Sequence, residues 1–376
     1  MQPPIKEKIK IAYILPSLDK GGAERFIVDL ILNLDRKIFE PVLVLFKRGG
    51  EWEKELAAEN IPVVIFHKRG KIAPLNFWRL VNFLKKFRPQ IVHTHLGGDI
   101  YGRLAAKFLQ TPVIITTEHN INPDENRCHN LAKRMTARWA DKIVAVSAAV
   151  KKDLIARYRT PADKIAVILN GIEIEKFLNR PAASREKNNR AMAPRPLVIG
   201  TIGRLSPQKG QAVLIEALTR LKTPNFRCLI AGNGELKDKL LKQIKTANLQ
   251  KKAALVGHVD AAIFLNSLDI FVLPSLWEGL GLVLLEAGLG GRPVIASATG
   301  GITEIINNDT GWLVKPGDVG ALAEKLNWLL NNSDSPKVRL KTDNLRAKVI
   351  AEFDIKKVAA DYQALYQELY ENTASQ

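Results

Sequence analysis

Residues 274–288 (PSLWEGLGLVLLEAG) are the stretch around which the rest of the chain can be interpreted. They follow residues 269–273 (DIFVL), an apolar run typical of a buried strand in a parallel sheet. Residues 278–281 are expected to open a helix, and their small side chains would let an anion approach the backbone N–H groups of its first turn. On such a helix the carboxylates of Glu278 and Glu286 would lie about 12 Å apart along the axis and on neighbouring faces. Two acceptors so placed can bind two separate hydroxyl clusters of one long ligand.

Positive charge comes from a second glycine-containing segment, residues 203–210 (GRLSPQKG), which follows another predicted strand. Arg204 offers a planar fork to phosphate oxygens, and Lys209 offers a mobile point charge. In the simpler interpretation Glu278 only caps its helix and Glu286 is solvated. The combination of the two segments favours a binding site for a phosphate flanked by hydroxyl groups.

Together these segments resemble the retaining glycosyltransferases of family 4, which have the GT-B fold. The resemblance is carried by Glu-Gly-Leu-Gly with a second glutamate eight residues after the first, and by Gly-Arg-Leu followed by Lys-Gly earlier in the chain. It extends over nearly the whole sequence. It implies an α/β protein with two Rossmann-like, doubly wound parallel-sheet domains facing a central cleft, and a final helix that crosses back to the first domain. It also implies a hexosyltransferase whose donor is a nucleotide-diphosphate sugar.

The 376 residues are expected to form two domains. Apolar runs alternate with segments of helical period on both sides of a polar, proline-bearing stretch, which favours two parallel sheets joined by a linker. The expected division is an acceptor-side domain at residues 1–178, a linker at 179–196, a nucleotide-sugar-binding domain at 197–354, and a returning helix at 355–376.

Net charge is concentrated in the first half of the chain. Residues 1–180 contain 31 Lys and Arg against 19 Asp and Glu, within a net charge of +18 for the whole sequence. Such a surface suits an anionic membrane or nucleic acid. No zinc-finger spacing or RNA-binding signature is present, so nucleic acid is not an expected partner. Of two segments that mix cations with apolar residues, 75–87 is expected to pack on the sheet and 127–142 to touch anionic lipid.

Location is expected to be cytoplasmic, peripheral on the inner face of a membrane. The sequence has no apolar run of transmembrane length and no signal-peptide pattern. Cys128 and Cys228 are too few for a disulfide framework, which agrees with a reducing compartment.

Further site residues follow from the resemblance to the family. Those expected to contact the donor are Gly21, Gly22, Gly203, Gly232, Gly257, His258, Val259, Gly279, Leu280, Gly281, Leu282 and Glu286. Those expected to act in catalysis are His119, beside the transferred sugar, together with Arg204, Lys209 and Glu278. Asn170 and Ser147 are expected to support the site, although Ser147 is more simply explained as the cap of a helix. His93 and His95 lie on one face of a predicted strand, but the sequence offers no nearby third ligand for a metal.

Breaking a sugar–phosphate bond requires neutralisation of the departing diphosphate. The sequence contains no Asp-x-Asp metal motif, so no metal and no other cofactor is expected. Arg204, Lys209 and the amides of residues 279–282 would neutralise the charge, while Glu278 binds sugar hydroxyls and Glu286 binds the ribose.

The expected partners are a UDP- or GDP-sugar donor and a glycan or lipid-linked acceptor, in synthesis of cell-envelope polysaccharide or glycolipid. Two other functions remain open: a nucleotide-sugar epimerase or phosphorylase on the same architecture, and a non-catalytic basic binding protein.

Overall fold

The structure is a computed structural model of the chain, and it describes residues 7–19, 21–67, 74–121, 123, 126–178 and 195–374. The predicted linker at residues 179–196 lies outside these ranges except for its last two residues. The chain divides into two compact units, one formed by Met1–Gly171 with Ile355–Gln376 and the other by Ile172–Asp354. Each is described by itself.

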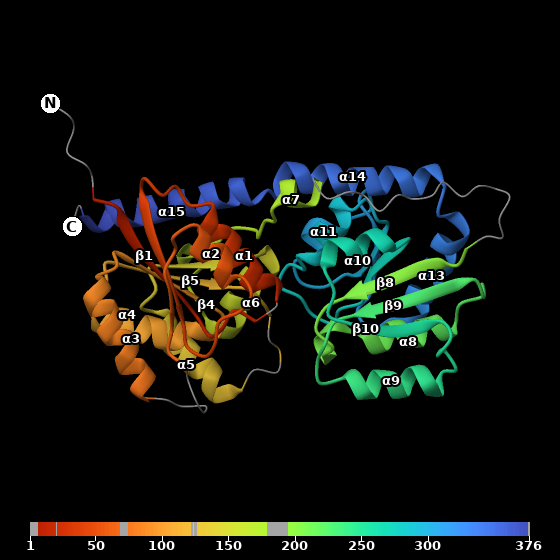
Figure 1. The fold of residues 1–376 in the computed structure, drawn as a ribbon, viewed down its shortest axis with the longest axis horizontal. Coiled ribbons are helices and arrows are strands. Elements are labelled where there is room, and N and C mark those ends of the chain that lie inside the picture. Colours follow the sequence, from red (N-terminus) through yellow and green to blue (C-terminus); the bar gives the residue numbers. More distant parts are fainter. Residues whose placement is uncertain are drawn as a thin grey trace. The chain divides into compact units, whose positions relative to one another are not determined.

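The first unit contains a seven-stranded parallel sheet in the order β3-β2-β1-β4-β5-β6-β7 (Figure 1). Its strands are β1 (Ile9–Leu15), β2 (Phe39–Leu45), β3 (Val63–Ile65), β4 (Ile91–His95), β5 (Val113–Glu118), β6 (Lys142–Ala145) and β7 (Ile165–Val167). Its helices are α1 (Gly22–Leu32), α2 (Glu53–Ala58), α3 (Pro74–Phe87), α4 (Asp99–Phe108), α5 (Arg127–Ala137), α6 (Ala148–Tyr158) and α15 (Ile355–Ala374), with 3₁₀ turns η1 (Leu96–Gly98) and η2 (Ala162–Lys164). The central strands β1, β4 and β5 are almost entirely buried because helices cover them, and α3 and α4 share one core with β1, β2, β4 and β5.

Helix α15 belongs to the first unit and packs against α1 (Figure 1). The buried hydroxyl of Tyr366 lies 3.0 Å from that of Tyr13 on β1 and 2.7 Å from Nδ1 of His93 on β4. Nε2 of His93 in turn lies 2.8 Å from the hydroxyl of Thr117 on β5. The helix is therefore attached to three central strands by a continuous buried chain of hydrogen bonds.

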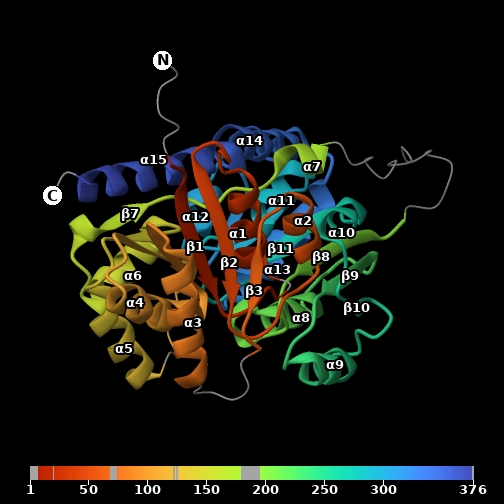
Figure 2. The same cartoon turned by 60° about the vertical axis from the view of Figure 1, so that its left-hand side comes forward.

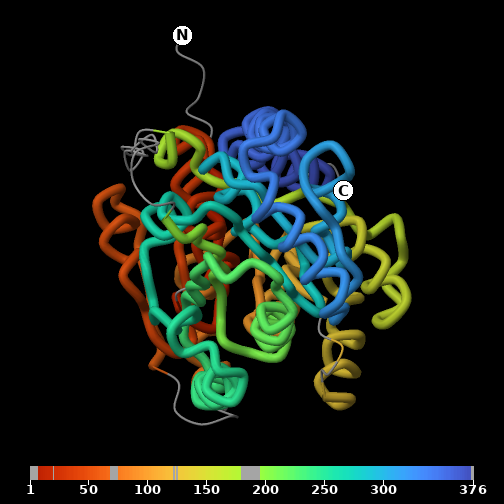
Figure 3. Tube along the Cα trace, turned by 90° about the vertical axis from the view of Figure 1, so that its right-hand side faces the viewer, coloured from red at the N-terminus to blue at the C-terminus, as the bar shows by residue number. Residues whose placement is uncertain are grey.

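The second unit contains a six-stranded parallel sheet in the order β10-β9-β8-β11-β12-β13. The chain of this unit is coloured from green to blue in Figure 3. Its strands are β8 (Leu197–Ile202), β9 (Phe226–Ala231), β10 (Ala253–Gly257), β11 (Ile270–Leu273), β12 (Val294–Ser297) and β13 (Trp312–Val314). Its helices are α7 (Ile174–Leu178), α8 (Gln211–Thr219), α9 (Lys237–Thr246), α10 (Ala261–Ser267), α11 (Val283–Leu289), α12 (Ile302–Ile305), α13 (Val319–Asn332) and α14 (Pro336–Glu352), with the 3₁₀ turn η3 (Pro207–Lys209).

This unit begins at Ile172, ahead of the expected boundary at residue 178. Its N–H donates to the carbonyl of Phe353 at 2.9 Å, and α7 packs against α11, so the short segment up to residue 178 is held by the second unit. The fold class predicted from the sequence, two doubly wound parallel sheets with a last helix returning to the first, is confirmed.

Both sheets have a point at which the strand order reverses. It lies between β1 and β4 in the first sheet and between β8 and β11 in the second. In open parallel sheets ligands bind beyond the carboxyl ends of the strands at this point. A ligand site is therefore expected at the loops after β1 and β4 in the first sheet and after β8 and β11 in the second. None of the helices in the described ranges is long and apolar enough to cross a membrane.

Candidate functional site

A buried carboxylate and a lysine meet at the reversal point of the second sheet. Glu278 follows β11 and is 5% exposed, and Lys209 ends η3, the turn that follows β8. Lys209 Nζ donates to Glu278 Oε1 at 2.5 Å. The same oxygen accepts a hydrogen bond from the Ser275 hydroxyl at 2.8 Å. The structure thus joins two of the predicted catalytic residues, one from each of the two segments that carry the resemblance.

Gln208 strengthens this arrangement. Its side-chain NH₂ group donates to the backbone carbonyl of Trp277 at 3.1 Å and lies 3.5 Å from Glu278 Oε2. The backbone carbonyl of Gln208 accepts from the backbone N–H of Leu276 at 2.7 Å. The loop after β8 and the loop after β11 are consequently bound to each other along their backbones. Gln208 and Ser275 were not predicted from the sequence, although both lie inside the two segments that stood out there.

Glycines allow the strand-end loops to approach closely. A Cβ atom on Gly210 would lie 2.0 Å from the carbonyl oxygen of Pro274, and one on Gly232 would lie 1.9 Å from that of Gly203. Gly300, with φ +53°, packs so tightly on the Glu278 backbone that a Cβ would lie 1.8 Å from its carbonyl oxygen. No larger residue fits at these positions, so the shape of the site requires glycine there.

One sequence expectation was wrong: the helix does not open at Glu278. Residues 278–281 form a loop, and α11 begins at Val283 and is only seven residues long. Gly281 adopts φ +86°, a left-handed conformation that interrupts a helix, and the loop is held by a hydrogen bond from the N–H of Gly301 to the carbonyl of Gly279. The helical separation of about 12 Å expected between Glu278 and Glu286 therefore does not apply. Residues 279–281 are therefore not the first turn of a helix, and the contact of residues 279–282 with the donor phosphates stays a prediction.

The other predicted donor residues of this unit lie in the loops that follow its strands, or at the start of α11 and on it. Leu280 is buried and Leu282 half-buried ahead of α11, and Glu286 is half-buried on it. Arg204 follows β8, where its carbonyl accepts from Gln211 at 2.8 Å and its side chain is exposed. Gly257 ends β10 with φ +71°, and a Cβ added to it would meet no atom within 4 Å. His258 beside it is exposed, and Val259 is half-buried.

His119, the catalytic candidate of the first unit, is buried after β5 and hydrogen-bonded to another histidine. Its Nε2 lies 3.0 Å from Nδ1 of His95, at the end of β4. His119 Nδ1 and His95 Nε2 are buried and have no hydrogen-bond partner among the residues that the structure describes. Burial lowers the pKa of His119 to about 3 and lowers the pKa of His95 well below its usual value, so both rings are neutral at pH 7. From the sequence His95 was considered only as a metal ligand, and this pairing was missed.

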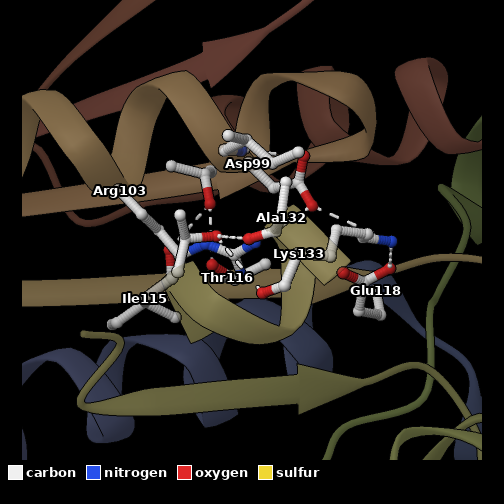
Figure 4. A network of polar contacts seen from close by, with 10 residues as sticks. Asp99, Arg103, Ile115, Thr116, Glu118, Ala132 and Lys133 are labelled. Atoms are coloured by element: carbon white, nitrogen blue, oxygen red, sulfur yellow. Dashed lines mark hydrogen bonds and ion pairs between the residues drawn. The ribbon is translucent and has the colours of Figure 1, made fainter. Parts of the chain in front are cut away.

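The residue before His119 belongs to a buried charged network, shown in Figure 4. Glu118 accepts a hydrogen bond from Lys133 Nζ at 2.9 Å, and the same Nζ lies 3.8 Å from Asp99, which pairs with Arg103 at 3.2 Å. Burial raises the pKa of Glu118 even though Lys133 opposes that shift. Lys133 lies in the segment expected to touch lipid, and for this residue the expectation was wrong because its ammonium group is needed inside to balance two carboxylates.

The remaining predicted residues of the first unit flank these histidines. Gly21 precedes α1 in extended conformation and Gly22 begins it, and Phe26 one turn later contacts the His119 ring at 6.0 Å between centroids. Ser147 caps α6, since its hydroxyl accepts from the N–H of Val150 at 3.1 Å, as the simpler interpretation held. Asn170 is buried, and its side-chain oxygen has no hydrogen-bond partner.

These arrangements define what chemistry is available. Lys209 and Glu278 place a cation, of a kind suited to phosphate, beside a carboxylate that can accept from hydroxyl groups, at the sheet position where ligands bind in this architecture. The ring nitrogens of His93 are hydrogen-bonded to two hydroxyl groups, and His95 is hydrogen-bonded to His119. No cluster of three or more His, Cys, Asp or Glu suited to a metal occurs in the ranges that the structure describes.

Known proteins match the chain in both halves. A family model described as Glycosyltransferase Family 4 matches residues 20–176, and one described as Glycosyl transferases group 1 matches residues 183–344. The chain is 29% identical over 312 residues to the UDP-Gal:alpha-D-GlcNAc-diphosphoundecaprenol alpha-1,3-galactosyltransferase of Escherichia coli, covering 78% of this chain and 79% of that protein.

Solved structures are similar over almost the full length. A glycosyltransferase from Rickettsia africae ESF-5 has a TM-score of 0.80 at 26% identity, over 98% of this chain and 100% of that one. Anabaena Alr3699/HepE, solved in complex with UDP-glucose, has a TM-score of 0.81 at 24% identity, over 98% of this chain and 100% of that one. At 24% identity, the similarity to the Anabaena structure shows a shared fold alone.

Proposed function

Since the chain belongs to the family 4 glycosyltransferases and has their GT-B fold, we propose that it moves a hexosyl unit from a nucleotide-diphosphate sugar to a glycan or lipid-linked acceptor, with retention of anomeric configuration and without a divalent metal ion. The resemblance seen in the sequence is confirmed, and the protein is a glycosyltransferase. The donor, the acceptor, the stereochemistry and the site residues form the proposal.

The contact between Lys209 and Glu278 is the observation that carries the proposal. A buried carboxylate bonded at 2.5 Å to a lysine and at 2.8 Å to a serine is held in one orientation. A diphosphate sugar presents adjacent phosphate and hydroxyl groups, and this pair offers one partner for each. The exposed guanidinium of Arg204, on the same loop as Lys209, adds a second cation for the phosphates.

In the proposed reaction the acceptor hydroxyl attacks the anomeric carbon from the face that the diphosphate leaves. The bond from that carbon to the phosphate oxygen breaks, and the hydroxyl proton passes to a phosphate oxygen, so the products are a glycoside and a nucleoside diphosphate. Lys209 and Arg204 stabilise the charge on the leaving group, and Glu278 orients the sugar. No carboxylate has to act as a nucleophile.

The Escherichia coli relative supports a particular choice of substrates. Its name specifies a UDP-sugar donor, an α linkage in the product and an acceptor attached to diphosphoundecaprenol. We therefore propose a UDP-hexose as donor and a lipid-linked saccharide as acceptor, used in polysaccharide synthesis at an anionic membrane surface. The excess of cations in residues 1–180 supports the membrane surface.

Donor binding and turnover test this proposal. A panel of UDP-glucose, UDP-galactose and GDP-mannose, read by melting temperature, should identify a donor, which at 100 times its dissociation constant adds about 2.7 kcal/mol of stability. Turnover with the identified donor should persist in EDTA. A strict Mg²⁺ or Mn²⁺ requirement would contradict the metal-free scheme, and conversion of the donor to an epimer without any acceptor would support an epimerase instead. Failure of every nucleotide sugar to bind would favour a non-catalytic protein.

A further inference from the structure

Helices α3, α4 and α5 form one layer on the first unit, and the outer side of this layer carries an unusual combination of side chains. α3 contacts α4 and α4 contacts α5, and the three lie together in both views of the unit (Figures 1 and 2). We call the exposed side chains of this layer the α3–α5 face. Its large apolar members are Leu75, Trp78, Phe108, Leu131 and Met135, and its cations are Arg79, Lys85, Lys86, Lys107, Arg127, Arg134 and Arg138.

The apolar members of the face are more than half exposed. Leu75 is 63% exposed, Phe108 61% and Leu131 57%, although α3 and α4 also bury apolar side chains in the core that they share with the sheet. Trp78 on α3 and Phe108 on α4 meet edge to face, with 5.9 Å between ring centroids, and so form a shared aromatic ridge. On α5, Leu131 and Met135 are four residues apart and lie on one side of the helix. Single exposed apolar residues are ordinary, whereas a group of this size on adjacent helices indicates a docking surface.

Charge on the face is of one sign. Within the described bounds of these helices, α3 and α5 contain no acidic residue. The single acidic residue of α4, Asp99, is fully buried and paired with Arg103. Asp124 and Glu125, which precede α5 in the sequence, are outside the described residues. The cations flank the apolar residues: on α5, Arg134 and Arg138 project beside Leu131 and Met135.

We propose that the α3–α5 face docks on an anionic lipid bilayer, with the Trp78–Phe108 ridge and Leu131 entering the interface and the surrounding arginines and lysines contacting lipid phosphates. Aromatic and aliphatic groups bordered by cations are what a surface needs to gain from both the headgroup charge and the acyl boundary. Nucleic acid would use the cations but would leave the aliphatic side chains in water. The inference extends the proposed function, from which it takes the lipid-linked acceptor, and it assigns the membrane contact to specific helices.

Vesicle sedimentation with the full-length protein tests the proposal directly. The protein should sediment with vesicles of phosphatidylcholine containing about 30 mol% phosphatidylglycerol, and much less with phosphatidylcholine alone. Raising NaCl from about 50 mM to about 500 mM should weaken binding without abolishing it, since the apolar contribution is not screened.

Paired variants separate the two contributions. R134Q/R138Q should lower partition into the anionic vesicles on the order of tenfold. W78S/F108S should remove the binding that persists at high salt. Matched controls on the second unit, K239Q/K242Q for charge and L241S/I263S for exposed apolar area, should bind like the wild type. Unchanged melting temperatures would show that all four variants fold.

Three outcomes would overturn the proposal: no binding of the wild type to anionic vesicles, equal losses in the second-unit controls, or equally tight binding to a short RNA duplex with the same dependence on Arg134 and Arg138. Release of the nucleoside diphosphate from the donor identified by the melting-temperature panel, measured without vesicles, should be the same in the surface variants as in the wild type. Its absence in the wild type would count against the proposed function, whereas vesicle binding is measured without turnover, so the two failures are distinguishable.

Discussion

Lys209 and Glu278 are in direct contact, so in the proposed mechanism their effects on catalysis should be coupled. Replacing Lys209 by Ala should lower turnover roughly 30- to 1000-fold, equivalent to about 2–4 kcal/mol of transition-state stabilisation. Glu278→Ala should cost a similar amount, and the double variant should lose less than the sum of the two, because contacting residues are not additive. Initial rates at saturating donor measure each value.

The exposed pair of Arg220 and Glu216, 3.2 Å apart in the same unit, provides the matched control. Arg220→Ala should leave turnover unchanged, since exposed pairs contribute little. Full activity in Lys209→Ala, or strictly additive losses in the double variant, would remove this pair from the catalytic machinery.

Gly300 packs against the backbone of Glu278, so replacing this glycine should lower the free energy of unfolding. Gly300→Ala places a Cβ 1.8 Å from the Glu278 carbonyl oxygen at φ +53°. Gly291, with φ +62° and no atom within 4 Å of an added Cβ, is the control. Gly291→Ala should cost about 1 kcal/mol from backbone strain alone. Gly300→Ala should cost roughly 1–3 kcal/mol more because the loop has to move. Urea unfolding of the two variants measures the difference, and equal losses would contradict the tight contact.

Single residues were predictable from sequence where the determinant is local. Ser147 was recognised as a helix cap because its hydroxyl needs only an N–H three residues ahead. Lys133 was misassigned to the surface because the carboxylates that hold it inside, Asp99 and Glu118, are distant in sequence. The roles of the predicted donor and catalytic residues stay predictions.

At the scale of elements, one hydroxyl group of α15, that of Tyr366, has two buried hydrogen-bond partners in the sheet. Tyr366→Phe removes the partner of both Tyr13 and His93 while keeping the ring, which leaves two buried polar groups unsatisfied. The expected cost is about 1–3 kcal/mol in the unfolding of the first unit. Tyr370, half-buried one turn later, is the control, and Tyr370→Phe should change stability by less than about 0.5 kcal/mol. Calorimetry shows whether the loss falls on one transition, and identical behaviour of the two variants would disprove the role of the hydrogen-bond chain.

Strands were the elements best predicted from the sequence. Residues 270–273 are apolar throughout, and β11 has those bounds. The start of α11 was not predicted, because Gly-Leu-Gly permits either a helix or a loop. The choice is made by Gly300 and Gly301, which follow β12 in the sequence and pack on the loop, so it cannot be inferred from the stretch itself.

For the molecule as a whole, buried histidines should make stability depend on pH. The folded pKa of His119 is about 3, and those of His93 and His95 are well below normal, while in the unfolded chain each is near 6.5. Below pH 6.5 the unfolded state therefore binds more protons than the folded state, and stability falls as pH falls. Each histidine contributes a slope of about 1.4 kcal/mol per pH unit.

Urea unfolding at several pH values between about 5 and 6.5 measures this slope. His119→Asn should reduce it by about one histidine's share. Tyr13→Phe, which alters the same cluster without removing an imidazole, should shift the midpoint and keep the slope. A slope unaffected by loss of His119 would mean that the ring is not kept neutral by burial.

The two-sheet architecture was predictable at this scale because alternating strands and helices repeat on both sides of a polar segment. The division at Ile172 was not, since it depends on a contact between residues at opposite ends of the second unit, the hydrogen bond from Ile172 to Phe353.

Helix α15 completes a unit whose other parts are encoded before residue 172. A ribosome adding about 5–20 residues per second translates the whole second unit in between, so a nascent first unit waits roughly 10–40 s for its last helix. During that interval Tyr13 and His93 lack their hydrogen-bond partner Tyr366. The half of the protein that is translated second is therefore the first that can finish folding.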